Sequence, residues 1–142
     1  MEEMINPNTG NIEFSEPPVS IKPSLSLSAF LSSPLGITAR LILKNGPWST
    51  FSVFAKSCGQ DFAVTLIFSN NMLLEAHIAM CWDGDSWKIW SEKSEHEKKL
   101  RHDSLLAEDI GTPPYNFPWG SVDSIVDPKT GGSSILVHYR SE

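Results

Sequence analysis

Hydrophobic and polar residues alternate along four successive segments in the first half of the chain, and a period of two residues predicts β-strands. The expected strands are 38–44, 50–56, 62–68 and 72–82. Short connections containing NGPW, CGQD and SNN separate them, which is typical of antiparallel hairpins. Because both faces of 62–68 carry apolar residues, we expect that strand to lie inside the sheet. The pattern therefore predicts an antiparallel meander.

The same alternation predicts which side chains point into the core. Phe51, Val53 and Ala55 share one face of the second strand, and Phe62, Val64, Leu66 and Phe68 share one face of the third. In the fourth strand the predicted core face consists of Met72, Leu74, Ala76, Ile78, Met80 and Trp82, with Glu75 and His77 opposite. In the first strand, Ala39, Leu41 and Leu43 alternate with Arg40, Ile42 and Lys44.

Residues 91–110 have the pattern of one long helix. Glu92–His96, Glu95–Lys99 and Glu97–Arg101 place an acid four residues before a basic side chain, the favourable order on a helix. Gly111 follows at a position where helices commonly end. We expect a narrow apolar stripe of Leu100, Leu106, Ala107 and Ile110, with His96 and Asp103 on the same stripe.

Turn signals organise both ends of the chain. NPNTG, within residues 6–10, predicts a hairpin turn, because Pro7 fixes φ and Gly10 tolerates the left-handed conformation. An extended, proline-containing segment follows, and Ser24 or Ser26 caps a short helix, LSAFLSS. Near the C-terminus, strands 121–127 and 133–139 flank a second turn of the same kind, DPKTGG.

These elements predict an α+β fold: an antiparallel sheet made of the meander and the C-terminal hairpin, with the long helix packed on one face and a short N-terminal helix. A length of 142 residues fits a single domain. Residues 1–23 would form the N-terminal hairpin and extended segment, and residues 24–142 the α+β core.

The net charge of the chain limits which classes of partner it is expected to bind. The chain has 17 Asp and Glu against 11 Lys and Arg, a net charge of −6, which argues against nucleic acid because phosphate binding needs a basic face. An acidic surface is compatible with a basic protein partner. The N-terminus lacks the pattern of a secretion signal and no segment is long and apolar enough for a membrane span, so we expect a cytoplasmic protein. The oligomeric state stays open.

Sequence motifs give no support to catalysis, metals or cofactors. HxH, CxxC and HExxH, the usual zinc-ligand spacings, are absent. The chain also lacks the GxSxG nucleophile motif and the GxGxxG and GxxxxGK phosphate loops. We therefore expect no catalytic residue, no metal and no cofactor.

Asp103 is the most unusual polar residue, because a carboxylate on an apolar stripe must find donors. We expect it to act as a structural pin for the loop TPPYNFPWG by accepting a hydrogen bond from a backbone amide, from Tyr115 or from the ring nitrogen of Trp119.

Aromatic residues cluster in two places, around the acidic turn DGDS and in the proline loop TPPYNFPWG. The candidate binding residues are Trp82, Asp83, Asp85, Trp87, Tyr115, Phe117 and Trp119. Exposed Trp and Tyr with an acidic rim would suit a protein-binding hot spot. The alternative is that these rings close the ends of the core.

Five segments carry a family resemblance: NPNTGNIEF, FLSSP, RHDSLL, PPYNFPWGSV and DPKTGGSSILVHY. In these segments, and most specifically in PPYxFPWG and DPKTGGSSI, the chain resembles a family of small uncharacterised bacterial single-domain proteins. That resemblance implies no particular activity. In size, acidity, α+β character and lack of catalytic motifs, the chain is also similar in type to toxin-immunity proteins.

Three functions follow as hypotheses. The first is a non-enzymatic protein-interaction module, with an immunity or inhibitor protein that neutralises a bacterial toxin as its specific form. The second is a small-molecule-binding module, with a pocket between helix 91–110 and the sheet lined by Trp90, His96 and Asp103. The third is a hydrolase with a site around His77, His102 and Asp103.

Overall fold

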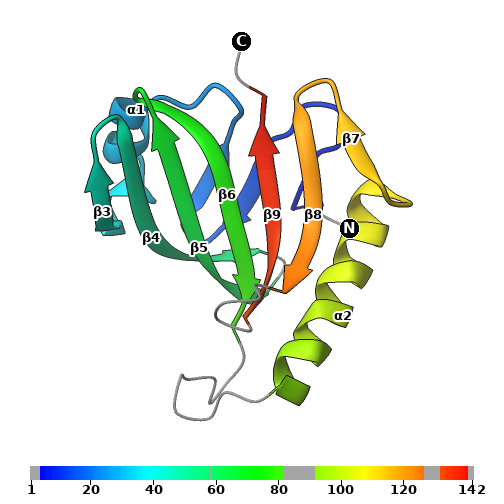
Figure 1. Cartoon of the computed structure of the whole chain (residues 1–142). Coiled ribbons are helices and arrows are strands. Elements are labelled where there is room, and N and C mark those ends of the chain that lie inside the picture. The colour runs from blue at the N-terminus through cyan, green and yellow to red at the C-terminus, as the bar shows by residue number, and fades with distance from the viewer. Residues whose placement is uncertain (1–3, 58, 82–91, 127–131, 141–142) are drawn as a thin grey trace.

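A computed structural model of the chain describes residues 4–57, 59–81, 92–126 and 132–140. Within these ranges the main feature is a seven-stranded antiparallel sheet with the order β3-β4-β5-β6-β9-β8-β7 (Figure 1). Its strands are β3 (Arg40–Asn45), β4 (Trp48–Ser57), β5 (Gln60–Ser69), β6 (Met72–Met80), β7 (Tyr115–Phe117), β8 (Gly120–Val126) and β9 (Ser133–Tyr139). The predicted α+β class, with its antiparallel sheet, is confirmed.

The C-terminal hairpin extends the meander into one continuous sheet. β9 pairs with β6, with Ile78 opposite Ile135, and β8 pairs with β9 along its whole length. β7 adds a short edge strand beside β8, within the segment TPPYNFPWG that the sequence pattern predicts to be a loop. The predicted DPKTGG turn spans residues 127–132, of which 127–131 lie outside the described ranges.

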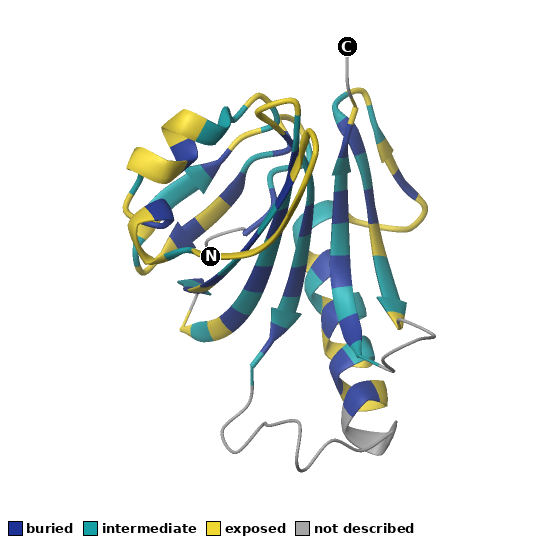
Figure 2. Cartoon of the chain, turned by 60° about the vertical axis from the view of Figure 1, so that its left-hand side comes forward, coloured by how far each residue is buried: buried dark blue, intermediate teal, exposed yellow. Residues whose placement is uncertain are grey.

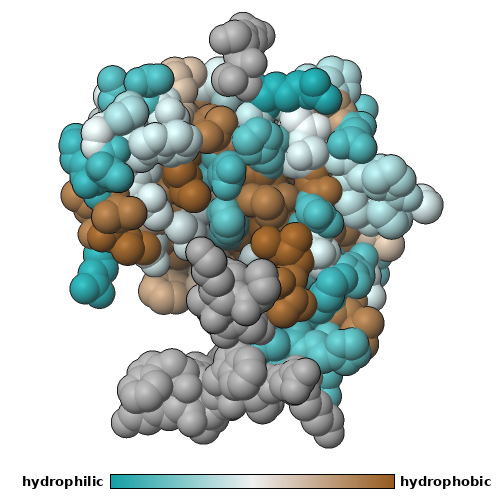
Figure 3. All heavy atoms as spheres, in the orientation of Figure 1, coloured by the Kyte–Doolittle hydropathy of each residue, from teal (hydrophilic) through white to brown (hydrophobic). Residues whose placement is uncertain are grey.

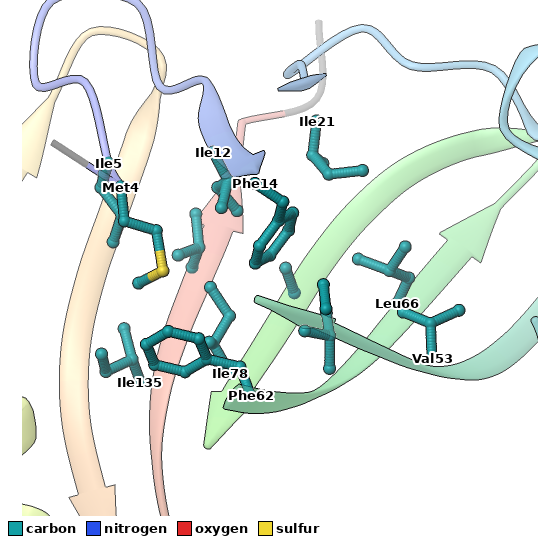
Figure 4. Close-up of a cluster of buried hydrophobic side chains, with 14 of the residues drawn as sticks. Met4, Ile5, Ile12, Phe14, Ile21, Val53, Phe62, Leu66, Ile78 and Ile135 are labelled. Carbon is teal, nitrogen blue, oxygen red and sulfur yellow. The ribbon is translucent and has the colours of Figure 1, made fainter. Parts of the chain in front are cut away.

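One face of the sheet is covered and forms the core. A hairpin of β1 (Ile12–Ser15) and β2 (Pro18–Ile21), the helix α1 (Leu27–Ser32), the 3-10 turn η1 (Gly36–Thr38) and the long helix α2 (Glu92–Ile110) lie on this face (Figures 1 and 2). Side chains of the N-terminal segment point toward those of the strands (Figure 4). No described helix or strand covers the opposite face, here called the open face.

Burial along β4 and β5 follows the predicted alternation, whereas β3 is exposed throughout and the start of β6 departs from the prediction. The expected core residues of β4 and β5 are buried. In β6, Leu73 is buried in place of the predicted Leu74, and Met72, which was also predicted to face the core, is 43% exposed. A bulge between Ile67 and Phe68 shifts the register so that Leu73 lies opposite Phe68. An inserted residue reverses the faces beyond it, which alternation alone does not reveal.

The NPNTG turn is held by the C-terminal half of the chain. Gly10 has φ of 80°, and a Cβ at this position would lie 2.5 Å from the Trp119 ring. The Trp119 Nε1–H donates to the Pro7 carbonyl at 2.8 Å, and the Tyr139 hydroxyl donates to the Gly10 carbonyl at 2.8 Å. The turn therefore needs glycine both for its backbone conformation and for the space that the indole occupies.

Two further N-terminal expectations are refined. The segment expected to be extended forms the β1–β2 hairpin. Ser26 is the residue that caps α1, because its Oγ accepts the Ala29 N–H at 3.2 Å. Phe30 is fully buried between Phe51 and Phe68.

The buried face of α2 differs from the predicted apolar stripe. Leu106 is buried as expected, but Leu100 is 53% exposed and Ala107 is exposed. The helix instead turns Glu95, Lys98 and His102 toward the sheet, and all three are buried. The prediction was wrong because it ranked helix faces by apolar content alone, whereas the strand ends facing α2 present backbone donors that require acceptors.

Candidate functional site

A groove of about 610 Å³ lies between α2 and the β7–β8 end of the sheet. α2 lines it with Lys99, Asp103 and Ala107, which are spaced by four residues along one side of the helix. The remaining lining comes from Pro113, Pro114, Tyr115, Asn116, Ser121, Val122, Asp123 and Ser124. Of the residues expected in such a pocket, Asp103 lines it. His96 lies about two helical turns from Asp103 on α2 and does not line the groove. Trp90 lies outside the described residues.

Asp103 is the best-connected charge of this groove. Lys99 Nζ donates to both of its carboxylate oxygens, at 3.0 and 3.2 Å. Desolvation opposes ionisation, but the Ser124 hydroxyl and the Lys99 ammonium outweigh it and lower the pKa of Asp103 below its ordinary value. Burial, reinforced by the Asp103 charge, raises the pKa of Tyr115. At neutral pH the groove therefore holds an ionised Asp103 with a neutral phenol close by.

The side chains expected to donate to Asp103 bind elsewhere. The Tyr115 hydroxyl donates to the Gly111 carbonyl at 3.0 Å, and the Trp119 ring nitrogen donates to Pro7. The two side chains still fasten the proline loop, but they do so through the backbone carbonyls of Gly111 and Pro7. Asp103 instead accepts from Lys99, one turn earlier on the same helix.

The three aromatic candidates that the structure describes lie in the hydrophobic core or pack against it. Tyr115 is buried, while Phe117 and Trp119 are stacked with ring centroids 4.9 Å apart. Trp119 also contacts Tyr139, with centroids 5.8 Å apart. In the described structure these rings therefore serve core packing. Trp82, Asp83, Asp85 and Trp87, the other candidates, lie outside the described residues.

α2 is attached to the ends of two strands by polar side chains. Glu95 Oε1 accepts the Ser133 N–H at the start of β9 at 2.9 Å. One heptad later, His102 Nε2 accepts the Met80 N–H at the end of β6 at 3.1 Å. Seven residues are about two helical turns, so these two acceptors lie in one row facing the sheet.

A third acceptor continues this row. Asp109, a further seven residues along, accepts the backbone N–H groups of Met4 and Ile5, each at 3.1 Å. The helix thus joins the N-terminal segment to the sheet. Glu95, His102 and Asp109, here called the anchor row, satisfy donors that would otherwise be buried without partners.

His102 is a neutral acceptor in a closed environment. Its side chain is fully buried, and desolvation, assisted by the nearby Lys98 ammonium, lowers its pKa to about 4. Lys98 forms a buried ion pair with Glu95 at 3.4 Å. Because His102 accepts a backbone hydrogen bond and is sealed from solvent, its role here is structural.

A second histidine cluster lies on the open face. Glu75 lies between His77 on the same strand, at 3.1 Å, and His138 on β9, at 3.3 Å. These side chains are partly exposed and do not line the groove. His77 lies on the opposite face of the sheet from His102, and Asp103 lies in the groove. The three residues of the hydrolase hypothesis are therefore not brought together in one site.

The end of the sheet formed by β3, opposite the β7 end, carries the most unusual exposed surface. All six residues of β3 are exposed, including Leu41 at 51%, Ile42 at 56% and Leu43 at 59%. β3 pairs with β4 on one side and is the last strand of the sheet on the other. Phe54 on β4 adds a side chain that is 71% exposed. Figure 3 shows apolar atoms at this end of the sheet, over β3 and β4.

This surface departs from the usual design of edge strands. Proteins commonly protect a free edge with short strands, inward charges, bulges or covering elements, because an exposed apolar edge can pair with another chain. β3 has a bulge between Leu41 and Leu43 and a cation near each end, Arg40 and Lys44. The three apolar side chains between them nevertheless remain in solvent. We call Arg40–Asn45 the open edge.

Comparison with known proteins adds no neighbour to this picture: no protein-family model, curated protein or solved structure matches the chain. Among the described residues, no group of three or more His, Cys, Asp or Glu is arranged to hold a metal ion. None of the helices found there is long and apolar enough to cross a membrane.

Sequence reasoning missed both the anchor row and the open edge, although each leaves a signal. The spacing of seven in Glu95, His102 and Asp109 is visible in the sequence and marks polar residues on one helix side. In the RLILK segment, three consecutive apolar residues lie between two cations. The alternating pattern obscured the exposure of this segment, because a strand with alternating residues is expected to bury one of its two faces.

Proposed function

We propose that this protein is a non-enzymatic protein-interaction module whose partner docks on the open edge. The observation that carries the proposal is the exposure of Leu41, Ile42 and Leu43, three consecutive apolar residues, on a strand with a free side. Covering such a surface removes apolar area from water and satisfies free backbone groups, which favours association. The specific form that we favour is an immunity or inhibitor protein that neutralises a cognate bacterial toxin.

Affinity capture with matched variants tests this function. The double variant Ile42→Ser/Leu43→Ser removes apolar surface from the open edge. Leu100→Ser/Val126→Ser is its control, since Leu100 and Val126 are exposed on α2 and β8. The wild-type protein and the control should retain a stoichiometric partner from the source lysate, and the open-edge variant should lose it. Equal capture by both variants, or no stoichiometric partner for the wild type, would contradict the proposal.

The groove supports a second candidate, the binding of a small polar molecule between α2 and β8. Asn116 on β7, together with Ser121 and Asp123 on β8, adds polar groups to the lining of the groove. A thermal-shift screen of small amines and sugars should find ligands that stabilise the wild type but not Asn116→Ala or Asp123→Asn. Ligands that stabilise all three proteins equally would place binding elsewhere.

A further inference from the structure

The open edge has the features of a strand acceptor. A strand at the end of a sheet presents a row of unpaired backbone N–H and C=O groups, and an extended segment of another chain can satisfy them. β3 is six residues long, which corresponds to roughly 20 Å. That length accommodates an added strand of about five or six residues.

The side chains of β3 favour a partner strand that carries apolar side chains on both of its faces. Leu41 lies opposite Phe51, which belongs to the core face, whereas Leu43 lies opposite Thr50 on the open face. An incoming strand would therefore have apolar neighbours above and below the sheet. A continuous apolar run, as in an internal strand, fits this environment better than a strictly alternating one.

The charge of the open edge is opposite in sign to that of the whole chain. Arg40 and Lys44 contribute two positive charges within six residues of a protein whose net charge is −6. Among the described residues, no ion pair joins either cation to a carboxylate of the chain. Opposite charges across paired strands are favourable. Net charge pointed to a basic partner, whereas the docking strand itself should carry acids.

A second copy of this chain is a poor occupant of the open edge. Antiparallel self-pairing centred on Ile42 would overlap all three apolar residues of both copies, but it would place Arg40 opposite Lys44 of the other copy. Like charges directly opposite one another are destabilising in a sheet. The bulge between Leu41 and Leu43 further restricts which strands can pair in register.

We propose that β3 accepts an extended segment of a different protein, antiparallel to β3, with a central apolar run flanked by acidic residues. This inference rests on the proposed function and specifies the partner of the same surface. The added strand would continue the sheet beyond β3, with its carboxylates beside Arg40 and Lys44 and its apolar side chains over Leu41, Ile42 and Leu43.

The probes are two synthetic peptides with the same apolar centre, Val-Ile-Val-Ile, one flanked by Asp-Asp and the other by Lys-Lys. Backbone amide shifts of the full-length protein in NMR titrations report where each peptide binds. The acidic peptide should shift residues 40–45 and bind about tenfold more tightly than the basic one. Arg40→Glu/Lys44→Glu should reverse this preference. An acidic peptide with alternate backbone amides methylated should lose binding, because strand addition needs those donors.

Several results would overturn the inference: no binding of the acidic peptide at millimolar concentration, equal binding of both peptides, shifts that map to the open face or the groove, or dimerisation of the free protein through β3 in sedimentation. These failures are distinguishable from failure of the proposed function. If Ile42→Ser/Leu43→Ser still abolishes partner capture, the open edge remains the docking surface and only strand addition is excluded.

Discussion

At one end of the sheet α2 buries Glu95, Lys98 and His102, whereas at the other end β3 exposes Leu41, Ile42 and Leu43. Each region departs from the usual distribution of polar and apolar residues, in opposite directions. At the α2 end every member of the anchor row accepts a hydrogen bond from a backbone donor, so these acceptors fasten α2 to β6, β9 and the N-terminal segment of the same chain. At the β3 end the apolar side chains and the free edge have no counterpart among the described residues.

The comparison shows that residues with unusual burial can have two different roles, one in folding and one in binding. A buried acceptor that binds a backbone N–H of another element fixes how the two elements pack, since an alternative arrangement would leave both groups without this bond. An exposed apolar strand contributes little to the folding of the free chain, because its side chains stay in water. Burying those side chains in a complex would stabilise the complex instead. Stability and binding should therefore respond to substitutions at opposite ends of the sheet.

The largest effect is expected from Glu95→Ala. This change removes the acceptor of the Ser133 N–H and one partner of the buried pair with Lys98, so the free energy of unfolding should fall by roughly 3 to 5 kcal/mol. Urea denaturation measures the change. Glu95→Gln keeps an acceptor for Ser133 and should cost less. A loss below about 0.5 kcal/mol for the alanine variant, the range of surface substitutions, would show that the anchor row does not hold α2.

Acidification should produce the next largest effect, through His102. Its pKa is about 4 in the folded protein against an ordinary value of 6.5, so between these values the unfolded chain binds the extra proton. Stability from this group is therefore present above pH 6.5 and is lost as the pH falls toward 4, by as much as about 3 kcal/mol.

Denaturation curves at pH 7, 6, 5 and 4 measure this dependence, and His102→Gln is the matched variant because its amide oxygen can accept the Met80 N–H without titrating. The difference in unfolding free energy between wild type and variant isolates His102 from the carboxylates that titrate in the same interval. Identical pH profiles for the two proteins would refute the assignment.

A smaller effect is expected at the N-terminal contact of α2. Asp109→Ala leaves the Met4 and Ile5 N–H groups without this acceptor and should cost about 1 to 3 kcal/mol. Hydrogen exchange at these two amides should accelerate more than exchange in β5. Asp109→Asn, which retains an oxygen acceptor, should preserve most of the protection. Uniform acceleration across the sheet would mean that the N-terminal segment is not held locally by Asp109.

The smallest effect on stability is expected at the open edge. Ile42→Lys adds a charge to a side chain that is already 56% exposed, so the free energy of unfolding should change by about 0.5 kcal/mol or less. Solubility should rise, since a charge on an apolar edge strand opposes association. A loss comparable to that of Glu95→Ala would place Ile42 in the core and remove the contrast between the two ends.

Much of the fold was predictable because it depends on local periodicity and turn chemistry. The alternation in 50–56 and 62–68 identified the core faces of β4 and β5, and Gly111 ended α2 as expected, with φ of 86°. The bulge near Phe68 was not predictable, because an extra residue in one strand shows only in its pairing with the neighbour.

The candidate sites were harder to predict, because both depend on what lies opposite a residue. The inward face of α2 is selected by donors of β6, β9 and the N-terminal segment, which are distant in sequence. Asp103 was recognised as unusual, yet its groove forms only where α2 meets β7 and β8. The exposure of β3 follows from its place at the end of the sheet, which alternation does not encode.

The sequence by itself determined the strands, the long helix, the main turns and the absence of familiar catalytic motifs, since each depends on residues near one another in the chain. Tertiary structure alone decided that α2 turns its polar row inward and that β3 keeps an apolar edge in solvent. The physical reason is that burial and hydrogen-bond satisfaction belong to pairs of surfaces, and a linear pattern describes only one member of each pair.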